Sequence, residues 1–253
     1  MYFHMNSLSY IYFSYLELDV TIDRRLKKEA KLFMNHKIVT MRRLVLYVGG
    51  LFLLTLGVSL SIQAGLGVSP VSSLAYALVL TSGLSIGITT VLANILFILV
   101  QIILNKRIDI KDLILQLLIS VVFGFFMDAT LFLVQLLPPP ESIVLRCVYL
   151  IISLFVVSAA LIGYFTAKLP LMPYDALTYV ISERFKMKFS KAKITSDLLN
   201  VFISAAIGLV FIQSFGSIGI GTIVAAYFIG KILGWMISRF QKPLQQWVYQ
   251  NEK

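Results

Sequence analysis

The sequence predicts an all-α integral membrane protein with about six transmembrane helices and two short re-entrant or interfacial helices, arranged as two inverted repeats. Apolar residues make up 58% of the 253 positions and charged residues only 13%, whereas soluble domains carry about 25% charged residues. Beyond residue 43 the apolar residues form long runs, several of which reach the roughly 20 residues that a helix needs to cross a bilayer. The pattern of these runs recurs after 103 residues.

Six long apolar runs predict the membrane spans, and two shorter runs predict the short helices. The short runs, 70–82 and 173–185, each open with a proline, which suits the first position of a helix because the N–H that proline lacks would be unsatisfied there. Both are too short to cross a bilayer comfortably. The predicted spans are 44–63, 84–104, 113–137, 142–167, 194–213 and 218–239.

The chain divides into four parts along its length. Residues 1–43 form a basic N-terminal extension, which we expect to be cytoplasmic and poorly ordered, and which lacks the pattern of a good signal peptide. Membrane repeat 1 covers 44–137, membrane repeat 2 covers 142–240, and 241–253 form a cytoplasmic tail. Whether residues 1–40 belong to the working protein is left open.

An internal duplication is the strongest signal of organisation. A shift of 103 residues places Pro70 on Pro173, and after an insertion of three residues Asn94 falls on Asn200. Each repeat holds three spans, an odd number, so the two halves have opposite orientations in the membrane. Inverted repeats of this kind are common in secondary transporters.

Basic residues set the predicted orientation. They gather in residues 24–43, 106–111 and 184–193 and near residues 239–242, whereas 138–141 and 214–217 contain no Lys or Arg. The positive-inside rule therefore places both termini in the cytoplasm. The net charge of +10 is a topology signal, so we expect lipid and no nucleic acid as partner.

Several kinds of chemistry lack the residues that they need. Cys147 is the only cysteine, and the two histidines, His4 and His36, lie in the N-terminal extension. An internal disulfide, a cysteine-based metal site and a histidine-based catalytic triad are therefore excluded. The sequence also lacks a glycine-rich phosphate loop with its Lys and Ser/Thr, which argues against an ATP-driven pump. We expect no enzyme activity, cofactor or metal.

One stretch resembles a known family. It contains Arg42-Arg43-Leu44, Tyr47-Val48-Gly49-Gly50, Gly57-Val58-Ser59-Leu60 and Ala64-Gly65-Leu66-Gly67-Val68-Ser69-Pro70. This stretch resembles the YczE-type branch of the YitT-like bacterial membrane proteins, and the likeness covers about residues 42–242. Because that family is largely uncharacterised, the resemblance implies a bacterial plasma-membrane protein and supplies neither a substrate nor functional residues.

Polar residues within the spans are the candidates for function, because polar groups at membrane depth are costly and usually face a partner or a water-filled cavity. The shift of 103 residues places Asp128 against Lys231, so we predict that the two pair, either as a proton or ion relay or as a structural ion pair. Asn94 and Asn200 either hold spans together or coordinate a ligand. Thr195 and Asp197 lie on the same helical start as Asn200, and Asp197 lies either at a site or at the wet end of its span.

The starts of the short helices, Ser69, Pro70 and Pro173, matter most for mechanism. If these starts lie within the membrane, their free N–H groups and positive dipole ends make a site for an anion or polar substrate. Asp175 is then expected to cap those donors. Alternatively, the second short helix lies flat at the surface, with Asp175, Thr178 and Ser182 facing water.

Together these features predict a secondary transporter or exporter of a small solute, with coupling to protons as one option and a pathway at the repeat interface. Asn94, Asn200, Asp128, Lys231 and Asp197 would line that pathway. The alternative is a membrane accessory or regulatory protein that acts through a partner and has a fully packed repeat interface. The sequence leaves the oligomeric state undetermined.

Overall fold

The computed structural model describes residues 38–105, 110–187 and 189–250. Within these residues six helical stretches are long and apolar enough to cross a membrane. They are Ile38–Ala64, α3 (Ile86–Leu104), α4 (Ile110–Gln135), α5 (Ile143–Thr166), α7 (Phe189–Phe211) and Ile220–Tyr249, which joins α8 (Ile220–Met236), the π-helix η1 (Ile237–Gln241) and α9 (Lys242–Tyr249). Two short helices, α2 (Pro70–Ser82) and α6 (Pro173–Arg184), complete the fold. The prediction of an all-α membrane protein is confirmed.

The observed helix ends differ from the predicted ones mainly near the termini. The first helix already includes Ile38, six residues before the predicted span. The last span continues beyond residue 239, because η1 and α9 extend the helical path to Tyr249. Residues 1–37, where most of the predicted poorly ordered extension falls, lie outside the described residues.

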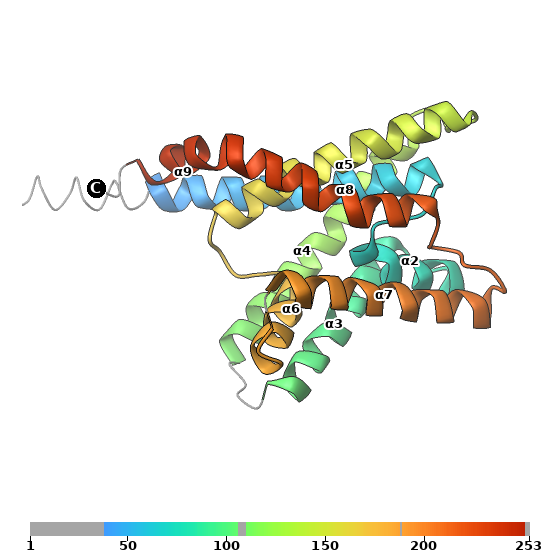
Figure 1. Ribbon diagram of the computed structural model, residues 1–253, viewed down its shortest axis with the longest axis horizontal. Coiled ribbons are helices and arrows are strands. Elements are labelled where there is room, and N and C mark those ends of the chain that lie inside the picture. The colour runs from blue at the N-terminus through green and yellow to red at the C-terminus, as the bar shows by residue number, and fades with distance from the viewer. Residues whose placement is uncertain (1–37, 106–109, 188, 251–253) are drawn as a thin grey trace, which may run out of the picture.

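The helices lie in two groups joined by α4 (Figure 1). Helix Ile38–Ala64, α5 and α8 lie together at the top of the view, and α2, α3, α6 and α7 lie below them. α4 packs along α3 and reaches the upper group. There the hydroxyl of Thr130 forms a 3.0 Å hydrogen bond with the hydroxyl of Ser59 in the first helix. α8 packs chiefly against α5.

Small residues allow the close helix contacts. A Cβ on Gly50 or Gly57 of the first helix would collide with Tyr164 or Val157 of α5. In the same way, a Cβ on Gly87 of α3 would lie 2.3 Å from the carbonyl oxygen of Gly124 in α4. Such small-residue contacts let helix backbones approach each other within a membrane, where burial of apolar surface does not drive association.

Each short helix packs against a long helix of the other half of the chain. α2, from the first half, lies along α7, and α6, from the second half, lies against α3. Each also contacts the long helix that follows it in sequence, so α2, α3, α6 and α7 form one unit. Each predicted repeat therefore contributes one short helix that packs on a long helix of the other repeat.

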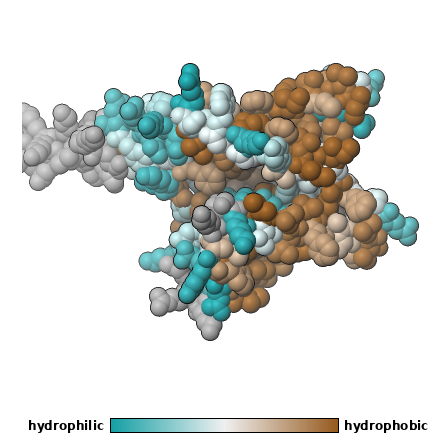
Figure 2. All heavy atoms as spheres, viewed as in Figure 1, coloured by the Kyte–Doolittle hydropathy of each residue, from teal (hydrophilic) through white to brown (hydrophobic). Residues whose placement is uncertain are grey.

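The surface has the polarity expected of a membrane protein. Figure 2 shows hydrophobic atoms over most of this face and hydrophilic atoms gathered toward its ends and between the two helix groups. α7 shows why: Leu198, Leu199 and Phe202 are exposed, whereas Asn200 and Ser204 are buried. An apolar outer face with a polar inner stripe suits a helix that contacts lipid on one side and a polar interior on the other.

Candidate functional site

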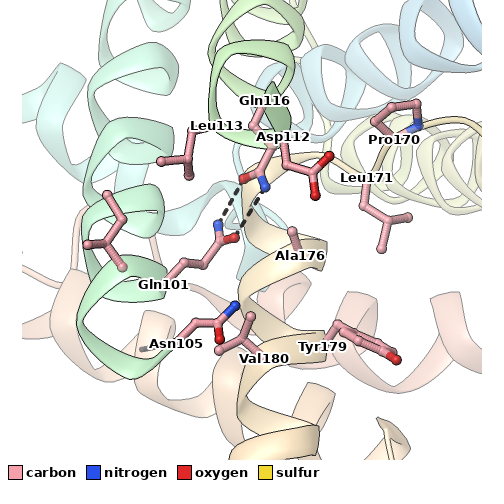
Figure 3. Close-up of a pocket in the computed structure, with 11 residues that line it drawn as sticks. Gln101, Asn105, Asp112, Leu113, Gln116, Pro170, Leu171, Ala176, Tyr179 and Val180 are labelled. Carbon is pink, nitrogen blue, oxygen red and sulfur yellow. Dashed lines mark hydrogen bonds between the residues drawn. The ribbon is translucent and has the colours of Figure 1, made fainter. Parts of the chain in front are cut away.

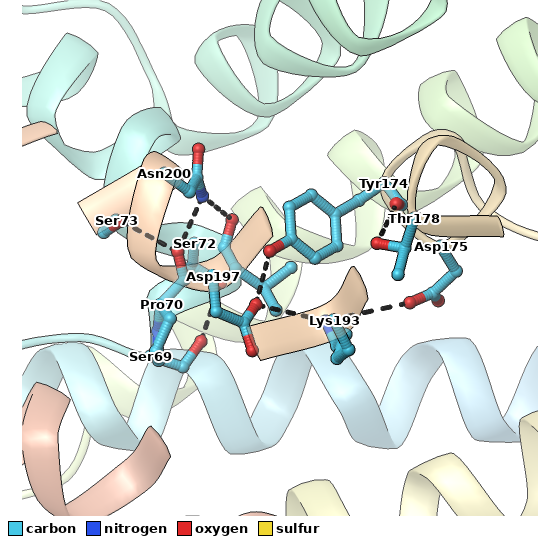
Figure 4. Close-up of polar contacts among 11 residues, drawn as sticks. Ser69, Pro70, Ser72, Ser73, Tyr174, Asp175, Thr178, Lys193, Asp197 and Asn200 are labelled. Carbon is cyan, nitrogen blue, oxygen red and sulfur yellow. Dashed lines mark hydrogen bonds and ion pairs between the residues drawn. The ribbon is translucent and has the colours of Figure 1, made fainter. Parts of the chain in front are cut away.

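One turn of α7 holds the starts of both short helices (Figure 4). The side-chain Nδ2 of Asn200 donates to the carbonyl oxygens of Pro70 at 2.6 Å and Val71 at 3.1 Å, in the first turn of α2. One turn earlier, Asp197 accepts a short hydrogen bond from the hydroxyl of Tyr174, in the first turn of α6. The spacing of three residues puts both side chains on the same face of α7.

Lys193 joins two carboxylates across α6 and α7. Its Nζ lies 3.3 Å from Oδ1 of Asp197 and 4.0 Å from Oδ1 of Asp175. The same ammonium lies 4.1 Å from the ring centroid of Tyr174, a cation–π distance. We call these four residues, Tyr174, Asp175, Lys193 and Asp197, the α6–α7 cluster.

The start of α6 is held from three sides. From α3, Nε2 of Gln101 donates to the carbonyl oxygen of Pro173 at 3.0 Å, and the ring of Phe97 packs edge-on against Tyr174. From α5, the hydroxyl of Tyr164 accepts the backbone N–H of Met172 at 2.6 Å. α7 supplies Asp197. This support fixes the position of the carboxylate of Asp175.

Asp175 is buried in the first turn of α6. Burial raises the pKa of its carboxyl above the ordinary Asp range, and the charge of Asp197 adds to the rise. Lys193 and a hydrogen bond with Tyr164 oppose both effects. The N-cap residue of α6 is Met172, whose side chain makes no capping hydrogen bond, and the polar partners of the Asp175 carboxylate are Lys193 and Tyr164 rather than backbone N–H groups of the helix start. The prediction that Asp175 caps the helix is therefore wrong.

Two buried polar atoms on the helices around this region have no partner among the described residues. They are Nδ2 of Asn94 in α3 and Oγ of Ser196 in α7. Asn94 lies one turn before Phe97 and two turns before Gln101, the residues through which α3 contacts the start of α6. Ser196 shares a helix face with Lys193 and Asn200, as its spacing of three and four residues requires. Each of the two residues is less than 10% exposed.

A cavity of about 590 Å³ lies on the other side of α6 (Figure 3). Gln101 and Gln116 lie side by side in its wall and exchange two amide hydrogen bonds of 3.0 and 3.3 Å. Gln101 also donates to Pro173, so this amide pair connects the wall of the cavity to the start of α6. The lining combines polar and apolar groups: Gln101, Ile102, Asn105, Asp112, Leu113, Gln116, Pro170, Leu171, Ala176, Tyr179 and Val180.

The structure brings together five of the predicted site residues. Pro70, Pro173, Asp175, Asp197 and Asn200 all lie where the short helices meet α7. Ser69 is the N-cap residue of α2, and its hydroxyl bonds to Ser72. Asn94 is buried in α3, on the same helix face as Gln101. Thr195 does not take part, because its hydroxyl bonds to the carbonyl oxygen of Lys191 in its own helix.

The predicted pairing of Asp128 with Lys231 is wrong. Asp128 accepts hydrogen bonds from the hydroxyl of Ser85 and the backbone N–H of Gly87, both at 2.8 Å. Lys231 is exposed and donates to Tyr227 one turn earlier in α8. The pairing fails because α4 packs along α3 whereas α8 packs along α5, so equivalent positions in the two halves do not meet.

α6 does not lie flat at the surface with its polar face in water. Asp175, Thr178 and Ser182, the face that this alternative turns toward water, are buried, whereas Tyr179 on another face is exposed. The structure therefore argues against the flat, water-facing alternative for this short helix.

Sequence reasoning missed Lys193, Tyr174, Gln101 and Gln116. Lys193 belongs to the basic cluster 184–193, which the sequence alone presents only as a topology signal. Gln101 and Gln116 are amides inside apolar runs, and that position alone was a usable signal. Tyr174 carried no signal beyond its place after Pro173.

These features define a multi-pass, all-helical membrane protein with a polar interior between two short helices and the long helices around them. The chain belongs to a family of unknown function, DUF6198, whose model matches residues 41–238. The matched range includes the α6–α7 cluster and the cavity.

Two bacterial relatives are similar over most of their length. An uncharacterised protein of Bacillus subtilis (strain 168), YyaS, is 29% identical over 189 residues, which cover 74% of this chain and 89% of the relative. An uncharacterised protein of Haemophilus influenzae (strain Rd) is 23% identical over 188 residues, which cover 74% of this chain and 80% of the relative. No solved structure matches significantly. The matches support the family and do not single out the YczE-type branch.

Proposed function

We propose that this protein is a secondary transporter or exporter of a small solute in the bacterial plasma membrane. The solute pathway runs between the two halves of the chain, past the starts of α2 and α6. The observation that carries this proposal is the meeting of both short helices at Asp197 and Asn200 of α7. Broken or short helices that end at a polar site within the membrane are typical of transporters with inverted repeats.

Mutual packing of the short helices supports an inverted repeat. α2 against α7 and α6 against α3 are equivalent contacts under the sequence alignment of the two halves. A rocking motion that opens one of these contacts while it closes the other gives alternating access to the region between them. On this proposal Gln101 and Gln116 close the pathway between the cavity and the α6–α7 cluster.

The cavity supports transport over the accessory role. The accessory role predicts a fully packed interface, whereas about 590 Å³ lies open beside α6. That volume is within the range of small-molecule sites. Its mixed lining suits a small solute with both apolar parts and hydrogen-bonding groups. An accessory protein that acts through a partner is the second candidate, and the following experiment separates the two.

The test works without naming the solute beforehand. Liposomes that contain the full-length protein are loaded with a small-molecule extract of a bacterial host, and mass spectrometry follows which compounds leave. We expect at least one compound to leave faster than from protein-free liposomes. Ala176→Trp fills the cavity from α6 and should reduce this efflux at least tenfold.

The matched control is Ala206→Trp, which adds the same side chain at an exposed position of α7. It should keep wild-type efflux. If every compound leaves liposomes with wild-type protein and protein-free liposomes at the same rate, the transport proposal is refuted and the accessory role is favoured.

A further inference from the structure

The α6–α7 cluster holds an odd number of charges. It contains two carboxyl groups, Asp175 and Asp197, and one ammonium group, Lys193. With all three ionised the cluster carries one net negative charge. Asp175 is the buried member, whereas Lys193 and Asp197 are partly exposed. An uncompensated charge at a buried carboxylate is costly, so the site favours the uptake of one positive charge there.

The geometry limits which positive charge fits. Lys193 already lies between the two carboxylates, at 3.3 and 4.0 Å, so its ammonium fills the place that a metal ion would need. A sodium ion would also need several further oxygen ligands in place of that ammonium. A proton needs no additional volume.

We propose that the α6–α7 cluster binds one proton, on the carboxyl group of Asp175, and that this proton is the coupling ion of the transport cycle. The coupling part rests on the proposed function, whereas the proton site stands on the cluster itself. On release, the O–H bond of Asp175 breaks, the proton passes to water, and the carboxylate left behind interacts with Lys193. On uptake the same steps run in reverse, and the cluster becomes neutral.

Two independent observations point to a ligand at this place. Nδ2 of Asn94 and Oγ of Ser196 are buried and have no partner among the described residues, and their spacing puts them on the same helix faces as Gln101 and Lys193, which contact α6. Buried polar groups are nearly always hydrogen-bonded in native structures. An amide donor and a hydroxyl are suited to a water molecule or a solute that arrives beside the cluster when it is protonated or deprotonated.

Asp175 is better suited to carry the proton than Asp197. Asp197 accepts the hydroxyl of Tyr174 and has the shorter contact with Lys193, and both interactions stabilise its charged form. Asp175 also has a phenol beside it, Tyr164, but its contact with Lys193 is the longer of the two and it is the more deeply buried acid. Burial also raises the pKa of Asp175, in keeping with this assignment.

The surroundings of Asp175 contain few other titratable groups. The first helix and α5 contribute phenols, α7 contributes the ammonium and carboxylate of the cluster, and α3 contributes the neutral Gln101. α4 brings one acid, Asp112, to the cavity beside α6. The titratable groups are Tyr47, Tyr164, Tyr174, Lys193, Asp197 and Asp112.

The proton site is tested by the pH dependence of thermal unfolding of the full-length protein. As pH rises from about 5 to about 9, wild-type Asp175 loses its proton and the cluster gains an uncompensated charge. The wild-type Tm should therefore fall by about 3 °C or more over this range. Asp175→Asn leaves the neutral pair of Lys193 and Asp197, so this fall should disappear. At the high-pH end the variant should be at least as stable as the wild type.

A purely structural ion pair predicts a different result, because Asp175→Asn would then lower the Tm at every pH. That outcome, or an identical pH slope in wild type and variant, would overturn the proposal. Glu183→Gln, which makes the same charge change at an exposed position of α6, should keep the wild-type slope. If Asp175→Asn does not fold, Asp197→Asn serves instead, because it also leaves one carboxylate and one ammonium.

Two further measurements complete the test. Infrared difference spectra of the wild type should show the C=O band of a protonated carboxyl group that disappears on raising the pH and is absent from Asp175→Asn. A rise in Tm on replacing choline with sodium at constant ionic strength would make sodium the ligand and overturn the proton assignment.

Coupling is tested on a compound found by the efflux experiment. Accumulation of that compound driven by a pH gradient should fall at least tenfold in Asp175→Asn and should stay at the wild-type level in Glu183→Gln. Unchanged gradient-driven accumulation would refute coupling and leave transport standing. If no compound moves at all, the proposed function fails, and the unfolding and infrared results still decide whether Asp175 binds the proton.

Discussion

The carboxylate of Asp128 illustrates how a charged residue inside a span can serve structure. It reaches from α4 to the first turn of α3, where it accepts the N–H of Gly87 and the hydroxyl of Ser85. The hydroxyl of Ser85 in turn accepts the N–H of Ile88. Helix N-termini leave four N–H groups without intrahelical partners and favour a negative charge nearby. Asp128 therefore caps α3 from a different helix.

Removal of this cap should destabilise the protein without changing its pH response. We expect Asp128→Ala to lower the free energy of unfolding by about 1–3 kcal/mol, because two hydrogen bonds to a charged acceptor are lost. Asp128→Asn keeps the shape and one acceptor, and should cost about half as much. Unfolding in lipid micelles, followed by the fluorescence of the two tryptophans, measures both variants.

A role of Asp128 in proton coupling would give the opposite pattern. In that case Asp128→Asn would leave stability nearly unchanged and abolish gradient-driven accumulation. If Asp128 is only a helix cap, as we expect, the fall of Tm with rising pH should be the same in Asp128→Asn and the wild type.

At the scale of single residues, sequence reasoning identified the polar positions better than their partners. Asn94 and Asn200 align in the two halves, yet Asn200 bonds to α2 while the amide nitrogen of Asn94 has no partner among the described residues. It is Gln101, two turns beyond Asn94 in α3, that makes the amide contact with the start of α6. Alignment of two repeats assumes equal packing, and these amides show that the packing has diverged.

The helical elements were predictable because hydropathy and proline position act locally. The start of each short helix agrees with the structure, since Pro70 and Pro173 fix the first helical residue. Hydropathy does not show which face of a helix turns inward, because lipid and protein interior are both apolar. Periodicity therefore could not show that Lys193 turns inward to Asp175 and Asp197.

The loop before α2 also holds the two halves of the chain together. The N–H of Val68 donates to the carbonyl oxygen of Ser217 at 3.1 Å, and the N–H of Gly221 donates to Leu66 at 2.7 Å. Gly67 lies between these bonds with φ of +104°, and a Cβ there would lie 2.4 Å from the backbone nitrogen of Gly219. Only glycine fits this position without moving the backbone.

Gly67→Ala should accordingly be among the most damaging single changes. It combines backbone strain with overpacking, each of which costs about 1–3 kcal/mol, so we expect a loss of roughly 2–6 kcal/mol in unfolding free energy. Gly83→Ala is the matched control, because Gly83 also has a positive φ, +71°, but has open space around its Cβ position. It should cost about 1 kcal/mol. Similar losses in the two variants would show that the contact between residues 66–68 and 217–221 contributes little.

At the scale of the whole molecule, the helix directions agree with the distribution of basic residues. Figure 1 shows the joint between α4 and α5 and the joint between α7 and α8 toward one end of the molecule, and α6 and α9 toward the other. The first end corresponds to 138–141 and 214–217, which lack Lys and Arg, and the second carries Lys168, Lys186 and Lys242. With the orientation that we expect from the positive-inside rule, α6 and the cavity would lie on the cytoplasmic side.

This topology determines which side first exchanges protons with Asp175. The cavity lies against Ala176, next to Asp175, and Asn105 lines it near the joint between α3 and α4. If that joint is cytoplasmic, the conformation described here is closed toward the outside and has its cavity on the inside. The two halves then have opposite orientations, as alternating access by an inverted repeat requires.

Cysteine labelling of intact cells tests this orientation directly. Cys147 is exposed and is first replaced by serine, so that each variant carries a single thiol. A membrane-impermeant maleimide should label Glu141→Cys from outside, and should label Asn105→Cys and Lys186→Cys only after the cells are opened. If intact cells label both Asn105→Cys and Glu141→Cys, both ends of α4 lie outside, and α4 does not cross the membrane. An even number of spans would then separate the two halves, the inverted repeat would be lost, and transport by alternating access would lose its structural basis.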